Sequence, residues 1–413
     1  MAWSGPLRKL AVSPLQRPST SVKNKIRCCA LLLAAALLPA SPAASREAPA
    51  VPGLDLSALY TADLVGIVDG GLEEGVRATD NLEVAVDADL SELAGWKGAR
   101  ARIHLLSNRS GRPNELAGTI QGINNIEVDE DRSKLYQLWI EQSFAEERVR
   151  LLLGLADLNA EFYQNEAASL LIGPAFGIGS ELAATGPNGP SIFPSTALTA
   201  RLRVAVGKDG YVQAATVNGK AGVLGDPDGI DVRMKDGLLL IGEAGWTRTG
   251  KLAAGFWRYT KRQPRFLLSE GEHDRRGEIA QGLYILVEQP ISIGRAEPLH
   301  LFARVGFSDG ETTPFRGGWQ IGGLWPAPIA GRPDGQFAFG INRGLLTSDY
   351  HLLVSEGSAT GGEDEVGFEL TYSDLVAPFM TLQPDIQYIR RLGGDPRTKD
   401  ALVLSLRVRL TLP

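Results

Sequence analysis

Pairs of arginines separated by one residue recur along the chain, and they are the first groups in the sequence that could do chemistry. Four such pairs are present: Arg100 and Arg102, Arg148 and Arg150, Arg201 and Arg203, and Arg407 and Arg409. Residues two apart lie on one face of a β-strand, so each pair would place two guanidinium groups, rich in N–H donors, side by side. Neighbouring charges cannot lie in a dry core. The face that carries them must therefore be wet.

The C-terminal stretch, residues 400–413, shows what stands opposite these charges. Two sets of side chains alternate there: Leu402, Leu404, Leu406, Val408, Leu410 and Leu412 in one, and Val403, Ser405, Arg407, Arg409 and Thr411 in the other. A period of two predicts a strand with one continuous apolar face. A terminal strand that is apolar outside and charged inside is typical of a transmembrane β-barrel, with lipid on one side and a water-filled lumen on the other.

The same alternation assigns inward and outward side chains elsewhere. Tyr136, Leu138 and Ile140 are predicted to point outward, and Gln137, Trp139 and Glu141 inward. The other predicted inward side chains include Glu83, Asp87, His104, Glu243, Arg304, Glu369 and Asp385. Five aromatic residues near strand ends are predicted to lie at the membrane interface, which suits amphipathic rings: Trp246, Trp257, Tyr259, Trp319 and Trp325.

Strand-length segments separated by unequal connections fill the chain after its first 53 residues. We predict 16 strands, at 54–66, 79–90, 98–107, 133–144, 147–156, 195–206, 210–217, 236–248, 251–261, 277–288, 299–308, 316–325, 336–346, 363–373, 379–391 and 399–412. Short turns alternate with long loops at 108–132, 157–194, 218–235, 262–276 and 347–362. This alternation is typical of outer-membrane barrels. The predicted fold class is all-β, a transmembrane antiparallel β-barrel of 16 strands.

The longest connection, residues 157–194, is predicted to fold into the lumen as a constriction loop, because loops of this length in compact proteins usually have a function. We expect a helix at residues 161–172 within it. Asp157, Asn159 and Glu161 are predicted to lie at the narrowest point, with Phe162 beside them. Asn159 has an alternative role as the cap of the expected helix.

The N-terminal segment is predicted to be a secretory signal peptide spanning residues 1–45. Basic residues precede an apolar run, 28–38, that is too short to span a membrane, and small residues follow it. The true start of translation is expected near Val22, and residues 46–53 form a lead-in to the barrel domain, 54–413. The segment holds six basic residues and no acidic one, so its removal lowers the formal charge from −6 to −12. So acidic a protein is a poor nucleic-acid binder.

Enzyme chemistry is not indicated. Both cysteines, Cys28 and Cys29, leave with the signal peptide, which excludes thiolate metal ligands and cysteine nucleophiles in the exported chain. The sequence lacks a His-Glu-x-x-His motif and a complete phosphate-loop motif, in which Gly-Lys is followed by Ser or Thr. The four histidines fall in different predicted strands or loops. We therefore predict no catalytic residue, metal or cofactor.

Four stretches resemble the carbohydrate-selective porin family, typified by the glucose porin of pseudomonads. They are Leu151–Phe162 followed by Asn165–Ser169, Ile321–Trp325 with Gly331–Asp334, Leu382–Ile389, and Gly393–Gly394. The block Gln383-Pro384-Asp385-Ile386-Gln387-Tyr388 is the most specific of them. One departure is the ending Thr411-Leu412-Pro413, where such chains commonly place an aromatic residue that the assembly machinery reads.

The resemblance implies a 16-stranded barrel in the Gram-negative outer membrane that admits sugars by passive diffusion. Its implied partners are small-molecule sugars, outer-membrane lipids and the barrel-assembly machinery. A homotrimer is one assembly that it allows, since trimers are common among 16-stranded porins.

A sugar is neutral and rich in hydroxyl groups, so a selective lumen needs forked donors, carboxylate acceptors and an aromatic platform. Each contact must stay weak, because a channel that binds tightly does not conduct. The predicted pore-lining residues are Arg100, Arg102, Trp139, Glu141, Arg148, Arg150, Asp157, Asn159, Glu161, Phe162, Arg201, Arg203, Arg304, Glu369, Asp385, Arg407 and Arg409.

Three alternatives stay open from the sequence. First, about half of these charges would pair with each other and hold the inserted loop, since buried charges usually have partners, and Trp139 would serve as a wedge or an interface residue. Second, the arginines would make a general or anion-leaning porin without sugar selectivity. Third, a secreted all-β carbohydrate-binding protein, with polar exposed faces, shares the alternating pattern.

Overall fold

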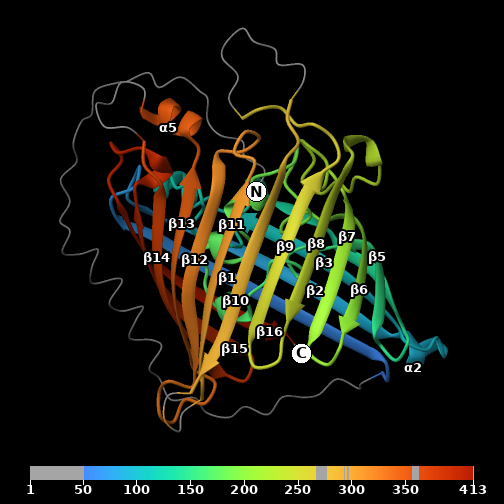
Figure 1. Cartoon of the computed structure of the whole chain (residues 1–413). Helices are drawn as coiled ribbons and strands as arrows, with labels where there is room; N and C mark the ends of the chain where they lie inside the picture. The colour runs from blue at the N-terminus through green and yellow to red at the C-terminus, as the bar shows by residue number, and fades with distance from the viewer. Residues whose placement is uncertain (1–50, 267–276, 293, 295–296, 356–361, 413) are drawn as a thin grey trace.

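The computed structural model describes residues 51–266, 277–292, 294, 297–355 and 362–412. The predicted signal peptide, residues 1–45, lies outside the described residues. Sixteen antiparallel strands form a closed barrel in which each strand pairs with its sequence neighbours and β1 pairs with β16 (Figure 1). The predicted fold class and strand number are confirmed.

The strand boundaries agree closely with the predicted ones. The strands are β1 Leu54–Asp69, β2 Gly75–Asp89, β3 Ala99–Ser110, β4 Arg132–Phe144, β5 Val149–Ala156, β6 Ala197–Val206, β7 Gly210–Asn218, β8 Leu238–Trp246, β9 Lys251–Tyr259, β10 Gln281–Ile291, β11 Leu299–Ser308, β12 Phe315–Pro326, β13 Gln336–Leu346, β14 Glu365–Ala377, β15 Met380–Arg390 and β16 Ala401–Leu412. The predicted long loops all join an odd-numbered strand to the next even-numbered one. They therefore lie at one end of the barrel, the long-loop end, and the tight turns lie at the other, the short-turn end.

Helical segments are short and lie in the connections. They are α2 Leu90–Ala94, α3 Asn114–Ala117, η1 Glu166–Ala168, η2 Pro174–Phe176, α4 Ser180–Ala183, η3 Met234–Asp236, α5 Ser348–Ser355 and η4 Leu392–Gly394. Among the described residues, no helix has the length and apolarity needed to cross a membrane.

The prediction of a helix at residues 161–172 is wrong. Only the short η1 forms there, because the backbone of Tyr163 adopts a positive φ of 58° that interrupts a helix. The N–H of Tyr163 is donated to the side chain of Glu243, and those of Ile172 and Gly173 to Glu369. The barrel wall has thus replaced the intrahelical hydrogen bonds, and Asn159 has no helix to cap.

The predicted alternation of faces is confirmed in the strands that define it. In β16, Val403 and Arg407 are buried while Leu404 and Leu406 are partly exposed on the outer face. Leu153 and other outward residues are half exposed. A closed barrel with an apolar exterior excludes the secreted, polar-surfaced alternative, since its outer face requires lipid.

The predicted positions of three residues are wrong. A bulge in β4, where the register shifts at Leu105 of β3, turns Tyr136 inward, and its hydroxyl is donated to Asp157. Trp257 and Tyr259 of β9 do not lie at the membrane interface: each is 1 % exposed, within the interior cluster that packs under the constriction loop. By contrast, Trp246 is exposed at the end of β8.

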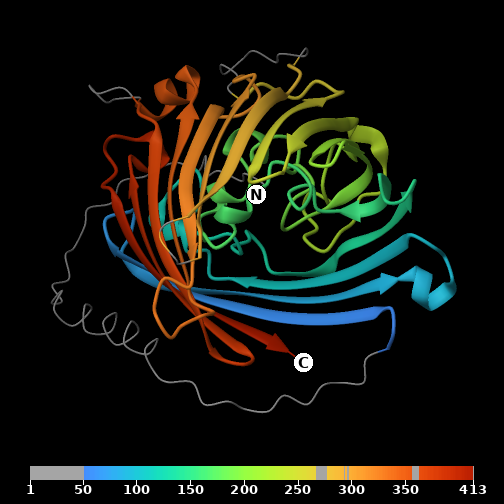
Figure 2. The same ribbon diagram turned by 60° about the horizontal axis from the view of Figure 1, so that its bottom comes forward.

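Within the described ranges, long connections enter the barrel. The β5–β6 connection (157–196) was predicted to do so, and the β3–β4 connection (111–131) does so as well; both appear as cyan-to-green segments inside the ring of strands in Figure 2. They touch each other where the N–H of Asn125 is donated to the carbonyl of Ile172. Together they fill the lumen along β8–β15.

The wall that faces these loops is built to receive them. A Cβ added to Gly340 of β13 would lie 2.6 Å from the ring of Phe176 and 2.8 Å from Leu171, both in the β5–β6 connection. At Gly306 of β11 a Cβ would overlap the side chains of Tyr163 and Glu181. Glycine is required at these positions because side chains of the constriction loop pack directly against the strand backbone and leave no room for a Cβ.

Candidate functional site

The inner wall of β1–β6 borders open space near the short-turn end. A cavity of about 550 Å³ lies there. Seven of the predicted pore-lining residues surround it: Arg100, Trp139, Glu141, Arg150, Glu161, Arg201 and Arg203. Asp55, Asp87 and Asp89 complete its charged lining. We call this space the vestibule; it brings together side chains from β1 to β6 and from the constriction loop.

Arg201 is the most buried charge of the vestibule, with 3 % of its surface exposed. Its Nη2 lies 2.6 Å from Glu141 Oε2 on β4 and 3.1 Å from Glu161 Oε2 on the constriction loop. Its Nε and Nη1 have no hydrogen-bond partner among the described residues. Arg201 therefore ties the loop to the wall and keeps two buried donor atoms without a protein partner.

Arg203 and Arg150 face each other across β5 and β6, in direct register. Like charges in this position are unfavourable. Arg203 is held aside by Tyr211, whose ring centre lies 4.0 Å from the guanidinium carbon, and by a 3.1 Å bond to Gln213 Oε1. In the described part of the chain, neither the Arg150 nor the Arg100 guanidinium has a protein hydrogen-bond or ion-pair partner. Their N–H groups are available to the lumen.

Further along the same wall, Arg102 Nη1 lies 3.6 Å from Asp87 Oδ1. The Arg102 side chain is 33 % exposed and the Asp87 side chain is 41 % exposed. Trp139 lines the vestibule and donates its indole Nε1–H to Gln137 Oε1 at 3.1 Å. The open wall thus presents donors, acceptors and one aromatic face within a single compartment.

Two predicted residues hold the constriction loop instead of facing the vestibule. Arg304 of β11 is 3 % exposed and donates to the carbonyls of Tyr163, Ala175 and Gly177. Glu369 of β14 accepts from the N–H groups of Ile172 and Gly173. These contacts agree with the alternative that some inward charges hold the loop.

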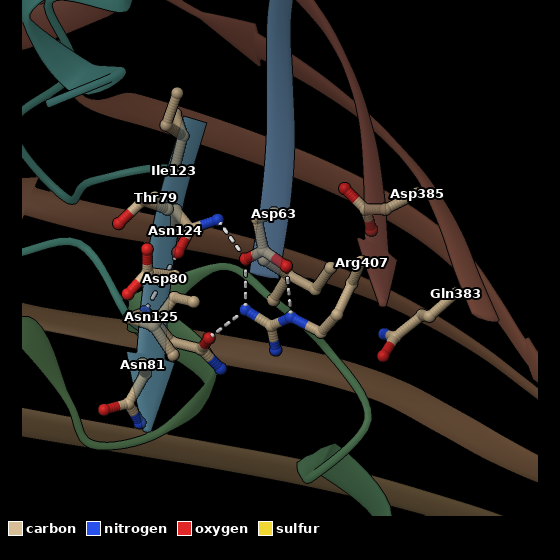
Figure 3. Close-up of polar contacts among 12 residues, drawn as sticks. Asp63, Thr79, Asp80, Asn81, Ile123, Asn124, Asn125, Gln383, Asp385 and Arg407 are labelled. Atoms are coloured by element: carbon tan, nitrogen blue, oxygen red, sulfur yellow. Dashed lines mark hydrogen bonds and ion pairs between the residues drawn. The ribbon is translucent and has the colours of Figure 1, made fainter. Parts of the chain in front are cut away.

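Arg407 has the same kind of role at the seam of the barrel. Figure 3 shows its guanidinium facing Asp63 of β1, with two parallel bonds of 2.8 and 2.7 Å. Asn124 and Asn125 of the β3–β4 connection bind the same pair at 2.6 and 2.7 Å. Asp385 lies nearby on β15 and accepts from Gln387 at 3.0 Å. This fork-to-fork ion pair joins the first and last strands under the inserted connection.

The remaining predicted residues lie apart from the vestibule. Asp157 is bound to Tyr136 and to the N–H of Asn159, and Asn159 donates to the carbonyls of Phe162 and Gly177. Phe162 is buried. Arg148 is exposed at the β4–β5 turn, and Arg409 is half-buried on β16. Of the three residues expected at the narrowest point, only Glu161 reaches the vestibule.

Sequence reasoning missed the role of the β3–β4 connection. Ile123 and Asn124 are fully buried inside the barrel, and Glu365 of β14 accepts from the N–H groups of Ile120 and Gln121. The one available signal was length, since residues 108–132 form a long loop. Among the described residues, no group of three or more His, Cys, Asp or Glu side chains is placed to hold a metal ion.

Comparison with known proteins gives consistent results. Residues 73–412 match the family described as carbohydrate-selective porin, OprB family. Porin B of Pseudomonas aeruginosa is 22 % identical over 408 residues, covering 86 % of this chain and 87 % of that protein. A high-pH structure of Pseudomonas putida OprB aligns with a TM-score of 0.78 at 19 % identity, covering 87 % of this chain and 94 % of that one.

A more distant fold neighbour is the outer membrane channel DcaP of Acinetobacter baumannii. It has a TM-score of 0.55 at 10 % identity and covers 90 % of this chain and all of that one (100 %). The family match spans most of the chain, and the barrel is a channel fold and not an enzyme fold. The chain therefore belongs to the carbohydrate-selective porin, OprB family, whose members are outer-membrane β-barrels of Gram-negative bacteria.

Proposed function

We propose that this porin passes neutral monosaccharides such as glucose by passive diffusion along the open wall of β1–β6. The observation that carries the proposal is the vestibule, where Arg150, Arg201, Glu141 and Glu161 surround one cavity with Trp139 at its side. Guanidinium groups donate to sugar oxygens and carboxylates accept from sugar hydroxyls. Trp139 offers a flat surface to the C–H face of a pyranose ring.

The energetics suit transport. A net hydrogen bond contributes about 0.5–1.5 kcal/mol, so a few of them hold a sugar briefly without trapping it. The unpaired N–H groups of Arg100 and Arg150 supply such bonds. Since each must be exchanged with water as the sugar moves, the wall acts as a series of weak sites.

Reconstitution of the purified protein tests this function. We expect liposomes to swell in glucose and glucose to block the ion current through single channels in planar bilayers. Migration on a gel before and after heating provides the control for a folded barrel. A strong preference for anions with no block by glucose would instead favour the general or anion-leaning porin, which the arginine pairs also allow.

The further partners rest on the family membership. We propose that outer-membrane lipids cover the apolar outer face, that the barrel-assembly machinery inserts the chain, and that the assembly is a homotrimer. Cross-linking in native membranes, followed by gel electrophoresis without heating, measures the number of copies. A single-copy band would remove the trimer and leave the channel function untouched.

A further inference from the structure

A continuous file of polar side chains runs along the inner faces of β2, β3 and β4 and ends at the vestibule. We call it the side-chain file; its members are Asn108, Asn81, Glu83, His104, Gln137 and Trp139. Asn108 donates to Asn81 at 2.8 Å, and Asn81 donates to Glu83 Oε1 at 2.5 Å. From the other end, Trp139 donates to Gln137 at 3.1 Å, and Gln137 Nε2 lies 3.2 Å from His104 Nδ1.

The chemistry of the groups fixes the direction of these bonds. An indole N–H can only donate, so Gln137 meets Trp139 with its oxygen and must turn its amide N–H₂ toward His104. His104 Nδ1 is then an acceptor, and the ring proton sits on Nε2. Nε2 lies 3.2 Å from Glu83 Oε2. Donation from Asn108 and Asn81 therefore ends on Glu83 Oε1, whereas His104 Nε2 faces Glu83 Oε2 at ion-pair distance without forming a hydrogen bond.

Burial separates the members of the file into two kinds. Asn81, Asn108, His104 and Gln137 are all buried. Glu83 is 34 % exposed, and Trp139 is partly exposed and lines the vestibule. The two groups that a sugar can reach are thus an acceptor and an aromatic surface, and the buried members connect them.

The histidine is also held from its other side. The Tyr136 ring meets the His104 ring edge to face, with centres 5.1 Å apart, and its hydroxyl is bound to Asp157 at 2.7 Å. The β4 bulge that turns Tyr136 inward makes this contact. His104 therefore has little freedom to rotate away from Gln137.

We propose that Gln137 and His104 are positioning residues of the sugar site, which fix the Trp139 indole and the Glu83 carboxylate in the orientation that receives a sugar. This inference rests on the proposed function, since it assigns the two groups that the file orients to sugar contact. Preorganisation of this kind lowers the entropic cost of a short-lived contact.

A double-mutant cycle on glucose block tests the inference. Trp139→Phe keeps an aromatic ring but removes the N–H that ends the file. We expect Gln137→Met alone to shorten the residence time of glucose about two- to tenfold, the range of one net hydrogen bond. In the Trp139→Phe background the same change should have no further effect. Additive effects, or an unchanged residence time in Gln137→Met, would overturn the proposal.

Controls separate positioning from general damage. Trp246→Phe alters a tryptophan that is exposed at the end of β8, so Gln137→Met should be additive with it. Conductance without sugar and gel migration after heating should match the unmodified protein. If Gln137→Met does not fold, His104→Asn and His104→Leu give the same test: Asn can accept from Gln137 and should retain the glucose residence time, whereas Leu should shorten it, and equal times for the two would contradict the proposal.

The outcome also distinguishes this inference from the function itself. Absence of glucose block in the unmodified protein would remove the proposed function. Glucose block that is present but insensitive to Gln137 and His104 would remove the side-chain file alone.

Discussion

Two halves of the barrel interior share one sequence pattern and use it in opposite ways. On β8–β15, inward carboxylates accept hydrogen bonds from backbone N–H groups of the inserted loops, as Glu243, Glu365 and Glu369 do. On β1–β6, inward charges meet other side chains, as Arg201 meets Glu141. The first half is filled by protein and the second borders the vestibule.

The difference teaches that an inward charge is not by itself a pore-lining charge. A buried carboxylate that receives two backbone N–H groups is satisfied and specifies where a loop must lie. Small residues accompany it, because Gly306 and Gly340 let the loop approach. Where no loop covers the wall, the charges keep unused donors and acceptors. Breaking each half should therefore have distinct consequences.

The largest effect is expected in the filled half, from Glu369→Ala. It leaves the N–H groups of Ile172 and Gly173 buried without partners, at a cost of about 2–6 kcal/mol. We expect the constriction loop to detach, with higher conductance and a lower temperature for the heat-induced shift in gel migration. Glu369→Gln keeps one acceptor and should be intermediate. Equal conductance in all three proteins would show that the loop does not depend on this carboxylate.

A smaller effect is expected in the open half, from Arg201→Ala. Loss of the guanidinium removes a charge-assisted bond worth about 1.5–3 kcal/mol and leaves Glu141 and Glu161 facing each other. The channel should become more selective for cations, and glucose block should weaken about tenfold or more. Reversal potentials in a salt gradient measure the ion selectivity, and single-channel recordings with glucose measure the block. Unchanged ion selectivity would place Arg201 outside the conducting path.

Trp139→Ala sharpens the comparison within the open half. An aromatic contact contributes about 0.5–1.5 kcal/mol beyond area burial, so the residence time of glucose should fall about two- to tenfold while conductance without sugar rises slightly. Trp246→Ala, on the outer face, is the matched control and should leave glucose block unchanged. If glucose blocked the Trp139→Ala channel as it blocks the unmodified one, Trp139 would only pack against its neighbours and would not contact the sugar.

The smallest effect is expected from Glu127, in the β3–β4 connection. Burial raises the pKa of its carboxyl from 4.5 to about 8. The backbone N–H of Asn114, which is donated to both carboxylate oxygens, lowers that pKa but does not offset the effect of burial. The unfolded chain ionises first as pH rises, so folded-state stability is greatest below about pH 4.5 and falls until about pH 8. Glu127→Gln should lose this pH dependence. The heat-shift midpoint at pH 5 and pH 9 measures it, and parallel slopes for both proteins would contradict the assignment.

The fold was largely predictable because its signal is local and repeated. The alternation at 402–412 indicates which face of the strand contacts lipid. A series of such segments, with short and long connections in turn, predicts the barrel and its number of strands. The errors fall where a local rule met a long-range contact. Tyr136 follows the alternation in sequence but a bulge opposite Leu105 reverses it. The expected helix at 161–172 failed because Glu243 and Glu369 bind its backbone.

The candidate site was predictable only in part, and Arg201 and Arg407 show why. Both belong to arginine pairs with the same spacing, and both are inward on their strands. Arg201 lines the vestibule, whereas Arg407 is closed over by Asn124 and Asn125. Nothing near either residue in the sequence distinguishes them.

The sequence by itself determined that one face of most strands is apolar and that the other is charged and wet, since side-chain period is a property of neighbouring residues. It thereby favoured a membrane barrel over a secreted all-β protein. Only the tertiary structure decided which inward charges a loop covers and which stay open to the lumen. The physical reason is that a carboxylate or guanidinium takes whatever partner the fold brings within hydrogen-bond distance, and for Glu369 that partner lies nearly two hundred residues away in the chain.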